Sequence, residues 1–319
     1  MSFLPPGLAR KGEPPPRLAV IDLGSNTAHM TVLQADPRDT RRLRILEELQ
    51  VITGLGRDPH DDGSLCEAGR RGALHALAHF SRRLDSLGVA PSAVRGATTS
   101  AVREAPNGHA FLAEVSDRTG IELDIVSGEE EAALTALAQA RSFPEHLPFV
   151  VADIGGGSTE VVLREHRGTA WATSLPVGSL KLAAAHRDDV ESLTSAVDEA
   201  LDQLPELRSH AALVVVAGTA TTALQIVAGR DLWDPDHVHG GSLERGALRD
   251  VRDRLAAIAP AERRRSVPGL VPGRADAITA GMTLLLGLMD WADTKEVVVS
   301  DRGVRYGLLW RAWPRAVVL

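Results

Sequence analysis

Two stretches of the chain, which begin at residues 20 and 151, repeat one pattern that is suited to holding phosphate. The first reads VIDLGSNT at residues 20–27, and the second reads VADIGGGST at residues 151–159. In each, an apolar run meets an aspartate and then a glycine-bearing turn with hydroxyl side chains. Glycine lets backbone amides approach a ligand without a Cβ in the way. The repeat therefore predicts two loops that each grip phosphate groups.

The residues of these loops are the first candidate ligands. Phosphate contacts are expected from the amides and hydroxyls of both loops, which comprise Gly24, Ser25, Asn26, Thr27, Gly155, Gly156, Gly157 and Ser158. Asp22 and Asp153 each stand just before a loop, and Mg²⁺ prefers a few carboxylates together with substrate oxygens and waters. We therefore expect Asp22 and Asp153 to be metal ligands, with Mg²⁺ or Mn²⁺ as the cofactor.

The segments that follow the loops read as strands. Residues 29–33 and 160–163 alternate apolar and polar side chains and are rich in β-branched types. The dinucleotide fingerprint and the P-loop both require the glycine turn to open a helix, and the P-loop also ends in Gly-Lys-Ser/Thr. Neither loop contains a lysine. Both nucleotide-binding motifs are excluded, and a glycine hairpin without a ligand is the structural alternative.

Three adjacent glutamates begin a predicted helix that ends near residue 142. Acidic side chains favour the positive N-terminus of a helix, which accounts for one or two of Glu129, Glu130 and Glu131. A third carboxylate that faces a bound phosphate can act as the general base toward a water molecule. The residue types leave open which of the three has that role.

Two further segments are candidates for phosphate contact. Residues 98–105 end a strand with hydroxyls and one arginine, Arg103, which either clamps a phosphate or forms a surface ion pair. Gly218 and Thr219 follow an apolar run and open a helix, a position suited to an anion. The arginines at residues 263–265, by contrast, are expected to form a solvated face.

Composition limits the class of protein. The net charge of −7 argues against general nucleic-acid binding but leaves room for a polyanionic substrate in a local cationic groove. The single cysteine, Cys66, excludes an internal disulfide framework and is typical of a reducing compartment. No apolar run reads as a signal peptide or a membrane span. We expect a cytoplasmic protein without a membrane segment or a nucleic-acid partner.

A chain of 319 residues can form two domains with sizeable cores. The pattern predicts two α/β halves, each led by a β-hairpin. A flexible proline-rich leader is expected at residues 1–16. The N-terminal domain would comprise residues 17–142 with 303–319, and the C-terminal domain residues 143–302. Predicted elements include helices over 67–87, 243–258 and 275–291 and a strand over 121–126.

Six motifs, in this order, resemble the exopolyphosphatase / guanosine pentaphosphate phosphohydrolase family: TTSAVREA, VSGEEEAAL, VADIGGGSTE, VAGTATT, GRADAITAGM and SDRGVRYGLL. Together with the first loop they extend the resemblance from about Arg17 to Leu309. It implies two ribonuclease H-like domains of the actin, sugar kinase and heat-shock chaperone superfamily around a central cleft. It also implies a final helix that packs back onto the first domain, in a short form without the C-terminal helical domain of longer members.

The resemblance assigns roles to particular residues. Glu131 matches the catalytic glutamate that activates the attacking water, Asp153 would support the metal, and Arg103 would bind a phosphate beside the reacting group. Two positions depart from the family pattern. Ala133 stands where an arginine commonly follows the catalytic Glu-Ala pair, and Tyr306 stands where a glutamate is usual.

These observations predict an Mg²⁺-dependent exopolyphosphatase that removes the terminal phosphate of inorganic polyphosphate. Three alternatives remain open. The chain could hydrolyse pppGpp to ppGpp, transfer phosphate from ATP as a sugar- or acid-kinase relative, or act as a non-catalytic sensor of polyphosphate or ppGpp. The expected partners are therefore inorganic polyphosphate or guanosine pentaphosphate as substrate, with assembly as a homodimer left open.

Overall fold

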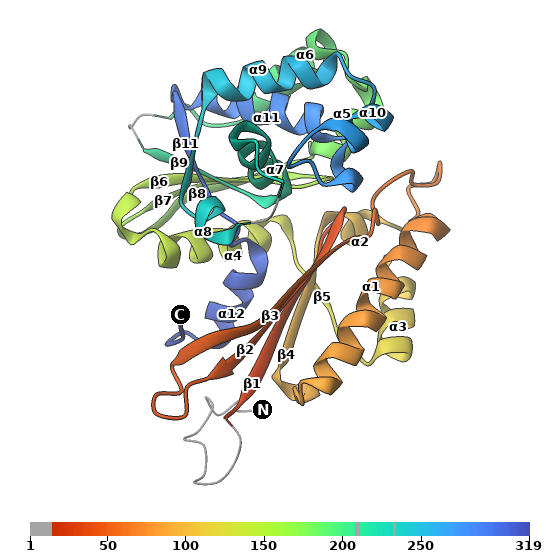
Figure 1. Ribbon diagram of the computed structural model, residues 1–319, viewed down its shortest axis with the longest axis vertical. Coiled ribbons are helices and arrows are strands. Elements are labelled where there is room, and N and C mark those ends of the chain that lie inside the picture. Colours follow the sequence, from red (N-terminus) through yellow and green to blue (C-terminus); the bar gives the residue numbers. More distant parts are fainter. Residues whose placement is uncertain (1–14, 208–210, 232–233) are drawn as a thin grey trace. The chain divides into compact units, whose positions relative to one another are not determined.

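The computed structural model describes residues 15–207, 211–231 and 234–319, and the predicted leader at residues 1–16 lies outside this part except for its last two residues. The chain forms two compact units. Unit 1 is Met1–Ser127 with Val304–Leu319, and unit 2 is Gly128–Gly303. Each unit is built on one six-stranded sheet (Figure 1).

The sheet of unit 1 has the strand order β12-β3-β2-β1-β4-β5. Strands β1 to β3 form an antiparallel meander, and β4 and β5 add in parallel beyond β1. The edge strand β12 runs parallel to β3. The strand bounds are β1 (Arg17–Leu23), β2 (Thr27–Ala35), β3 (Arg42–Ile52), β4 (Val94–Thr98), β5 (Asp124–Ile125) and β12 (Val317–Val318).

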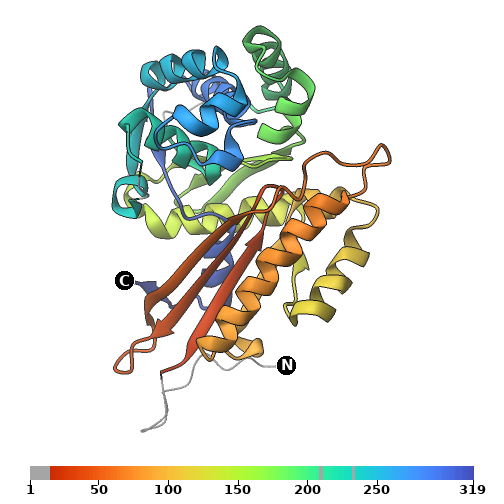
Figure 2. The ribbon, with the colours of Figure 1, turned by 45° about the vertical axis from the view of Figure 1, so that its right-hand side comes forward.

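Helices cover both faces of this sheet (Figures 1 and 2). They are α1 (Glu67–Ser86), α2 (Ser100–Glu104), α3 (Gly108–Thr119) and α12 (Val304–Ala312), with a 3-10 turn at Pro91–Ala93. Ala19, Ile21 and Leu23 alternate along β1 and share one apolar cluster with the buried faces of α1 and α3. Helix α12 packs on β1 and β4 from the other side, as the resemblance implied.

The sheet of unit 2 has the order β10-β11-β9-β6-β7-β8. Strands β6 to β8 form an antiparallel meander, and β9 and β11 add in parallel beyond β6, which repeats the core topology of unit 1. The predicted α/β class with two ribonuclease H-like sheets is confirmed. The bounds are β6 (Phe149–Ile154), β7 (Thr159–Glu165), β8 (Gly168–Leu175), β9 (Ala212–Val216), β10 (Gly241–Glu244) and β11 (Glu296–Val299).

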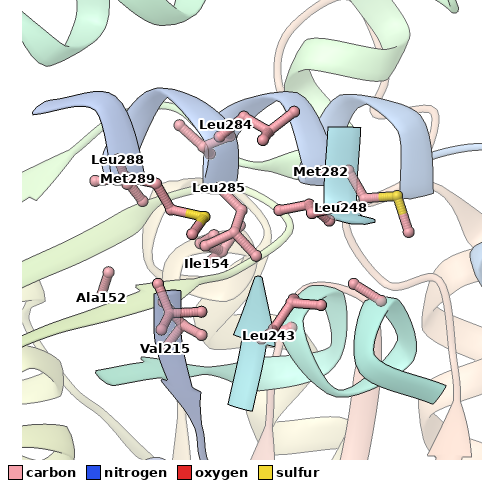
Figure 3. Close-up of a cluster of buried hydrophobic side chains, with 14 of the residues drawn as sticks. Ala152, Ile154, Val215, Leu243, Leu248, Met282, Leu284, Leu285, Leu288 and Met289 are labelled. Atoms are coloured by element: carbon pink, nitrogen blue, oxygen red, sulfur yellow. The ribbon is translucent and has the colours of Figure 1, made fainter. Parts of the chain in front are cut away.

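The two faces of β6 pack against different helices. Ala152 and Ile154 lie beneath α11, whose Leu285 and Met289 reach toward the sheet (Figure 3). Phe149 and Val151 point the other way and pack with Ala132 and Ala136 of α4. Because side chains alternate along a strand, Asp153 belongs to the α4 face. The helices of unit 2 are α4 (Gly128–Ser142), α5 (Ser179–His186), α6 (Val190–Leu201), α7 (Ala217–Ala228), α8 (Pro235–Val238), α9 (Arg245–Ala256), α10 (Pro260–Ser266) and α11 (Ile278–Trp291), with 3-10 turns at Pro144–His146 and Pro272–Arg274.

Several elements differ from the sequence predictions. Helix α4 groups with unit 2, so the units divide after residue 127 rather than near 142, because α4 packs on β6, β7 and β8. Strand β8 was not predicted, since its residues lack an apolar run and only Leu175 is buried. The predicted helix over 243–258 begins as strand β10, which pairs with β11. The predicted strand over 121–126 shortens to two residues. No helix in the described part of the chain is long and apolar enough to cross a membrane.

Candidate active site

The two predicted phosphate loops have the same backbone geometry. Each joins two antiparallel strands, β1 to β2 and β6 to β7. Each closes with one hydrogen bond, from the Gly24 amide to the Thr27 carbonyl at 2.9 Å and from the Gly155 amide to the Ser158 carbonyl at 3.0 Å. The amide of Ser25 is not a donor in any backbone hydrogen bond of the turns and loops among the described residues. Such turns leave backbone N–H groups available to an anion.

A later turn in unit 1 holds the carbonyls of the first loop. The Asn26 carbonyl accepts from the amides of Thr53 at 2.9 Å and Gly54 at 3.1 Å, and the Ser25 carbonyl accepts from Gly56 at 2.7 Å. This turn follows β3, the third strand of the meander. The carbonyl side of the loop is therefore satisfied within the protein.

Unit 2 braces its own loop in the same way, with the turn that follows β8 and begins α5. The Gly156 carbonyl accepts from the amides of Leu180 at 2.9 Å and Lys181 at 3.2 Å, and the Gly155 carbonyl accepts from Ser179 at 2.9 Å. Gly178 opens this turn, and a Cβ there would lie 2.6 Å from the carbonyl carbon of Gly156. The brace therefore requires a residue without a side chain at this position.

Glu131 and Asp153 lie on the same side of the unit 2 sheet. The Thr135 hydroxyl donates to Asp153 Oδ2 at 3.0 Å. Glu131 precedes Thr135 by four residues, which places both on one face of α4. Glu131 is 7% exposed, whereas Glu129 is exposed and Glu130 half-buried. The structure thus separates the three glutamates and turns only Glu131 toward the sheet.

Burial changes the acidity of Asp153. The side chain is 7% exposed, and this burial raises its pKa from 3.8 to about 6, against the opposing effect of the Thr135 hydrogen bond. A nearby cation stabilises the ionised form of such a carboxylate, because its positive charge offsets the cost of ionisation at a buried position.

The side chains at the site fit a metal ion that is bound partly by the protein and partly by the phosphates of the substrate. The described residues contain no group of three His, Cys, Asp or Glu side chains that could hold a metal ion. Asp153 supplies one buried carboxylate, and Gly303 leaves its flank open, since a Cβ there would be 3.7 Å from Asp153 Oδ2. Mg²⁺ is commonly bound by one or two carboxylates plus substrate phosphates. Asp153 therefore remains the proposed ligand in unit 2, and Asp22 in unit 1.

Replacing Asp153 with asparagine is expected to stabilise the metal-free protein at neutral pH. A carboxyl whose folded-state pKa is raised favours folding below its unfolded pKa, and that contribution is lost as pH rises from about 4 through about 6. The shift corresponds to at most about 3 kcal/mol. Thermal unfolding with EDTA should give Asp153→Asn a higher Tm than wild type at about pH 7.5 and a similar one at about pH 4.

The exposed Asp250 of α9 offers a matched control. Asp250→Asn removes the same charge and should leave the Tm difference small at both pH values. A lower Tm for Asp153→Asn than for wild type near pH 7.5 would show that burial does not destabilise the ionised Asp153 carboxylate.

In unit 1, side chains from three elements meet beside the first loop. The hydroxyls of Ser25 and Ser100 lie 3.0 Å apart, and both residues are buried. Arg103 follows on α2, where its guanidinium donates to the Val126 carbonyl at 2.8 Å. Arg57, which the sequence analysis did not consider, donates from Nε to Asn26 Oδ1 at 3.2 Å. The first loop thus has arginines on two nearby segments.

A second arginine that the sequence analysis missed is Arg274, at the end of the 3-10 turn Pro272–Arg274 in unit 2, whose side chain lies over the start of α7. Arg274 is 7% exposed, and its guanidinium donates to the Thr222 hydroxyl at 3.2 Å. It covers Gly218, where a Cβ would overlap the guanidinium. The predicted candidates Gly218 and Thr219 do begin α7. For Gly218, the lack of a side chain makes room for Arg274.

The guanidinium of Arg274 is buried, and no carboxylate of the described residues pairs with it. Burial alone lowers its pKa to about 10, so it remains a cation at neutral pH. Its Nε has no hydrogen-bond partner among the described residues. A buried charge is costly unless it is paired and hydrogen-bonded. This environment fits an anion that binds from outside the protein. Arg274 is the arginine of the motif GRADAITAGM, which was the available sequence signal.

Comparison with known proteins agrees with this chemistry. The model of the Ppx/GppA phosphatase family matches residues 32–316. The chain belongs to this family. This Ppx/GppA protein is 33% identical over 315 residues to an uncharacterized protein of Streptomyces coelicolor, with 92% of this chain and 90% of the relative covered.

Three further proteins are similar to this Ppx/GppA protein. A guanosine-5'-triphosphate,3'-diphosphate pyrophosphatase of Photobacterium profundum is 24% identical, with 92% of this chain covered. The chain spans 59% of that relative and 44% of another curated relative. The crystal structure of the Aquifex aeolicus Ppx/GppA family member has 27% identity and a TM-score of 0.77, and the match covers 95% of this chain and 99% of that one. The resemblance to the family and the fold are therefore confirmed.

Proposed function

We propose that this Ppx/GppA phosphatase hydrolyses the terminal phosphoanhydride bond of inorganic polyphosphate and releases orthophosphate. The observation that carries the proposal is the Arg274 guanidinium, a buried cation that pairs with no carboxylate in the part of the chain that the structure describes. It lies in the same unit as the second glycine loop. The groups next to it are Gly218 and the Thr222 hydroxyl. Because these neighbouring groups are polar or small, they favour a ligand made of phosphate over one that needs an apolar surface.

In the proposed reaction, the Glu131 carboxylate accepts a proton from a water molecule. The water oxygen forms a bond to the terminal phosphorus, and the bond from that phosphorus to the bridging oxygen breaks. The electron pair stays on the bridging oxygen, so the products are orthophosphate and a chain one phosphate shorter. Catalysis of this kind depends mainly on positioning and on stabilising charge.

The remaining groups of unit 2 would stabilise that charge. The amides of Gly156 and Gly157 and the Arg274 guanidinium are donors suited to phosphate oxygens, whose charge is spread in the transition state. A Mg²⁺ or Mn²⁺ ion held by Asp153 and phosphate would neutralise further negative charge on the substrate. Arg103 and the loop at residues 24–27 are the proposed phosphate contacts of unit 1.

Hydrolysis of pppGpp to ppGpp is the second candidate, and the relative from Photobacterium profundum favours it by its name. The two activities are tested together by measuring phosphate release from polyphosphates of several lengths, pppGpp and ATP, each with Mg²⁺, Mn²⁺ or EDTA. The proposal expects the highest kcat/KM on polyphosphate with a divalent metal.

Other outcomes would identify the alternatives. A higher kcat/KM on pppGpp would assign the second activity. Tight binding of polyphosphate without phosphate release under every metal condition would indicate a sensor. A phosphorylated acceptor formed from ATP would indicate a kinase.

A further inference from the structure

The three arginines at residues 263–265 in α10 lie in three different environments. Arg263 is fully buried, Arg264 is partly exposed in an ion pair, and Arg265 is exposed. The prediction of a solvated face is therefore wrong for Arg263. The reason is that α10 packs beside the 3-10 turn Pro272–Arg274, so the first arginine of the run points inward.

Arg263 ties three segments of unit 2 together. Its Nε donates to the Leu255 carbonyl at 2.7 Å, and its Nη1 donates to the Ala275 carbonyl at 3.0 Å. Its Nη2 lies 2.8 Å from Asp188 Oδ2. A guanidinium with several acceptors in fixed directions sets the relative position of the segments that supply them. One of those segments begins directly after Arg274.

Arg264 contacts the next residue of the same segment. Its Nη2 donates to both carboxylate oxygens of Asp276. Consecutive arginines of α10 thus hold consecutive residues, the Ala275 carbonyl and the Asp276 carboxylate, on the C-terminal side of Arg274. The turn itself is closed by the Arg274 amide, which donates to the Val271 carbonyl at 2.8 Å.

We propose that Arg263 and Arg264 are positioning residues, which hold the turn so that Arg274 stays over Gly218. The inference rests on the proposed function, in which Arg274 binds phosphate. A long cationic side chain gains hydration by moving into water. Burial disfavours the charged guanidinium of Arg274 where it lies. A braced backbone opposes that movement while the phosphate site is empty.

Arg264→Ala is the test variant, because Arg264 is partly exposed and its loss should not unfold the protein. Arg263 is unsuited, since it is fully buried and its removal would leave the half-buried Asp188 carboxylate without its cation. The control is Arg265→Ala, which removes the same side chain one position along α10. We expect Arg264→Ala to raise the KM for polyphosphate about two- to fivefold, the range available to a partly exposed ion pair. Arg265→Ala should leave KM unchanged, and Arg264→Lys should restore part of the loss.

Two further measurements separate positioning from a general effect. Amide hydrogen exchange at residues 272–277 should be faster in Arg264→Ala than in Arg265→Ala. In an Arg274→Gln background, Arg264→Ala should change KM no further, because residues that act through one group are not additive. Equal exchange in the two alanine variants, or an undiminished KM effect without Arg274, would overturn the inference.

The proposed function fails in a different way. If Arg274→Gln hydrolysed polyphosphate as wild type does, the phosphate role of Arg274 would be refuted, and the inference would fall with it. If Arg274→Gln were impaired while Arg264→Ala matched Arg265→Ala in KM, the proposed function would stand and the inference alone would be refuted.

Discussion

Replacing Glu131 with glutamine is expected to slow phosphate release from polyphosphate about 10²- to 10⁴-fold, the usual cost of losing a general base. An amide has almost the same size as the carboxylate but cannot take a proton from water. Glu131 is buried on the face of α4 that carries Thr135, so the substitution keeps the packing and removes only the basic group. The effect should fall on kcat, with KM for polyphosphate little changed.

Glu129→Gln is the matched control, since it removes the same charge from the same helical turn at an exposed position. It should retain nearly full activity. Thermal unfolding of both variants should follow the wild type, which would exclude misfolding as the cause. Equal rates for Glu131→Gln and Glu129→Gln would refute the assignment of the base, although phosphate binding by the loops would be unaffected.

The second large effect is expected from Gly178→Ala, which should lower kcat/KM for polyphosphate about 10²-fold. The added Cβ would lie 2.6 Å from the Gly156 carbonyl carbon and oxygen and 2.8 Å from the Gly155 oxygen. All three are backbone atoms, so no side chain can swing aside to relieve the overlap. The loop must move, and a displacement of about 1 Å in a catalytic site can cost about 10²-fold in rate.

Gly246→Ala tests whether any alanine for glycine has this effect. Gly246 lies in α9, and a Cβ there would meet no atom within 4 Å. Alanine has the higher helix propensity, so this control should be neutral or slightly stabilising. Measurement of kcat/KM and Tm for both variants completes the comparison. A Gly178→Ala enzyme with wild-type kcat/KM would mean that the second loop does not position the substrate.

The fold was largely predictable because its signals are local. The glycine and hydroxyl pattern of each loop, with alternating strands on both sides, predicts a hairpin from a few adjacent residues. The unit to which α4 belongs was harder to predict. Its residues follow the first half in sequence, yet Ala132 and Ala136 bury their side chains against the second sheet. A helical pattern predicts an apolar face without identifying the sheet that covers it.

The candidate site was predictable only in part, for a related reason. Residue type and the family resemblance singled out Glu131 and Asp153, and their roles remain predictions. Arg274 was missed because only its surroundings make it a candidate: it is buried, and no carboxylate among the described residues pairs with it. Arg263 was assigned to solvent because three adjacent arginines usually are exposed. The charge balance around a side chain depends on residues distant in sequence, so composition and spacing do not reveal it.

The bracing of the two loops has a consequence for how this protein can change. Gly56 supports the first loop from within unit 1, and Gly178 supports the second from within unit 2. The carbonyl side of each loop is therefore held from within one continuous stretch of sequence, residues 20–56 or 151–181. We expect a substitution within one stretch to leave the backbone of the other loop in place. The duplicated hairpin thus allows one phosphate loop to change its ligand preference while the other loop keeps its backbone shape.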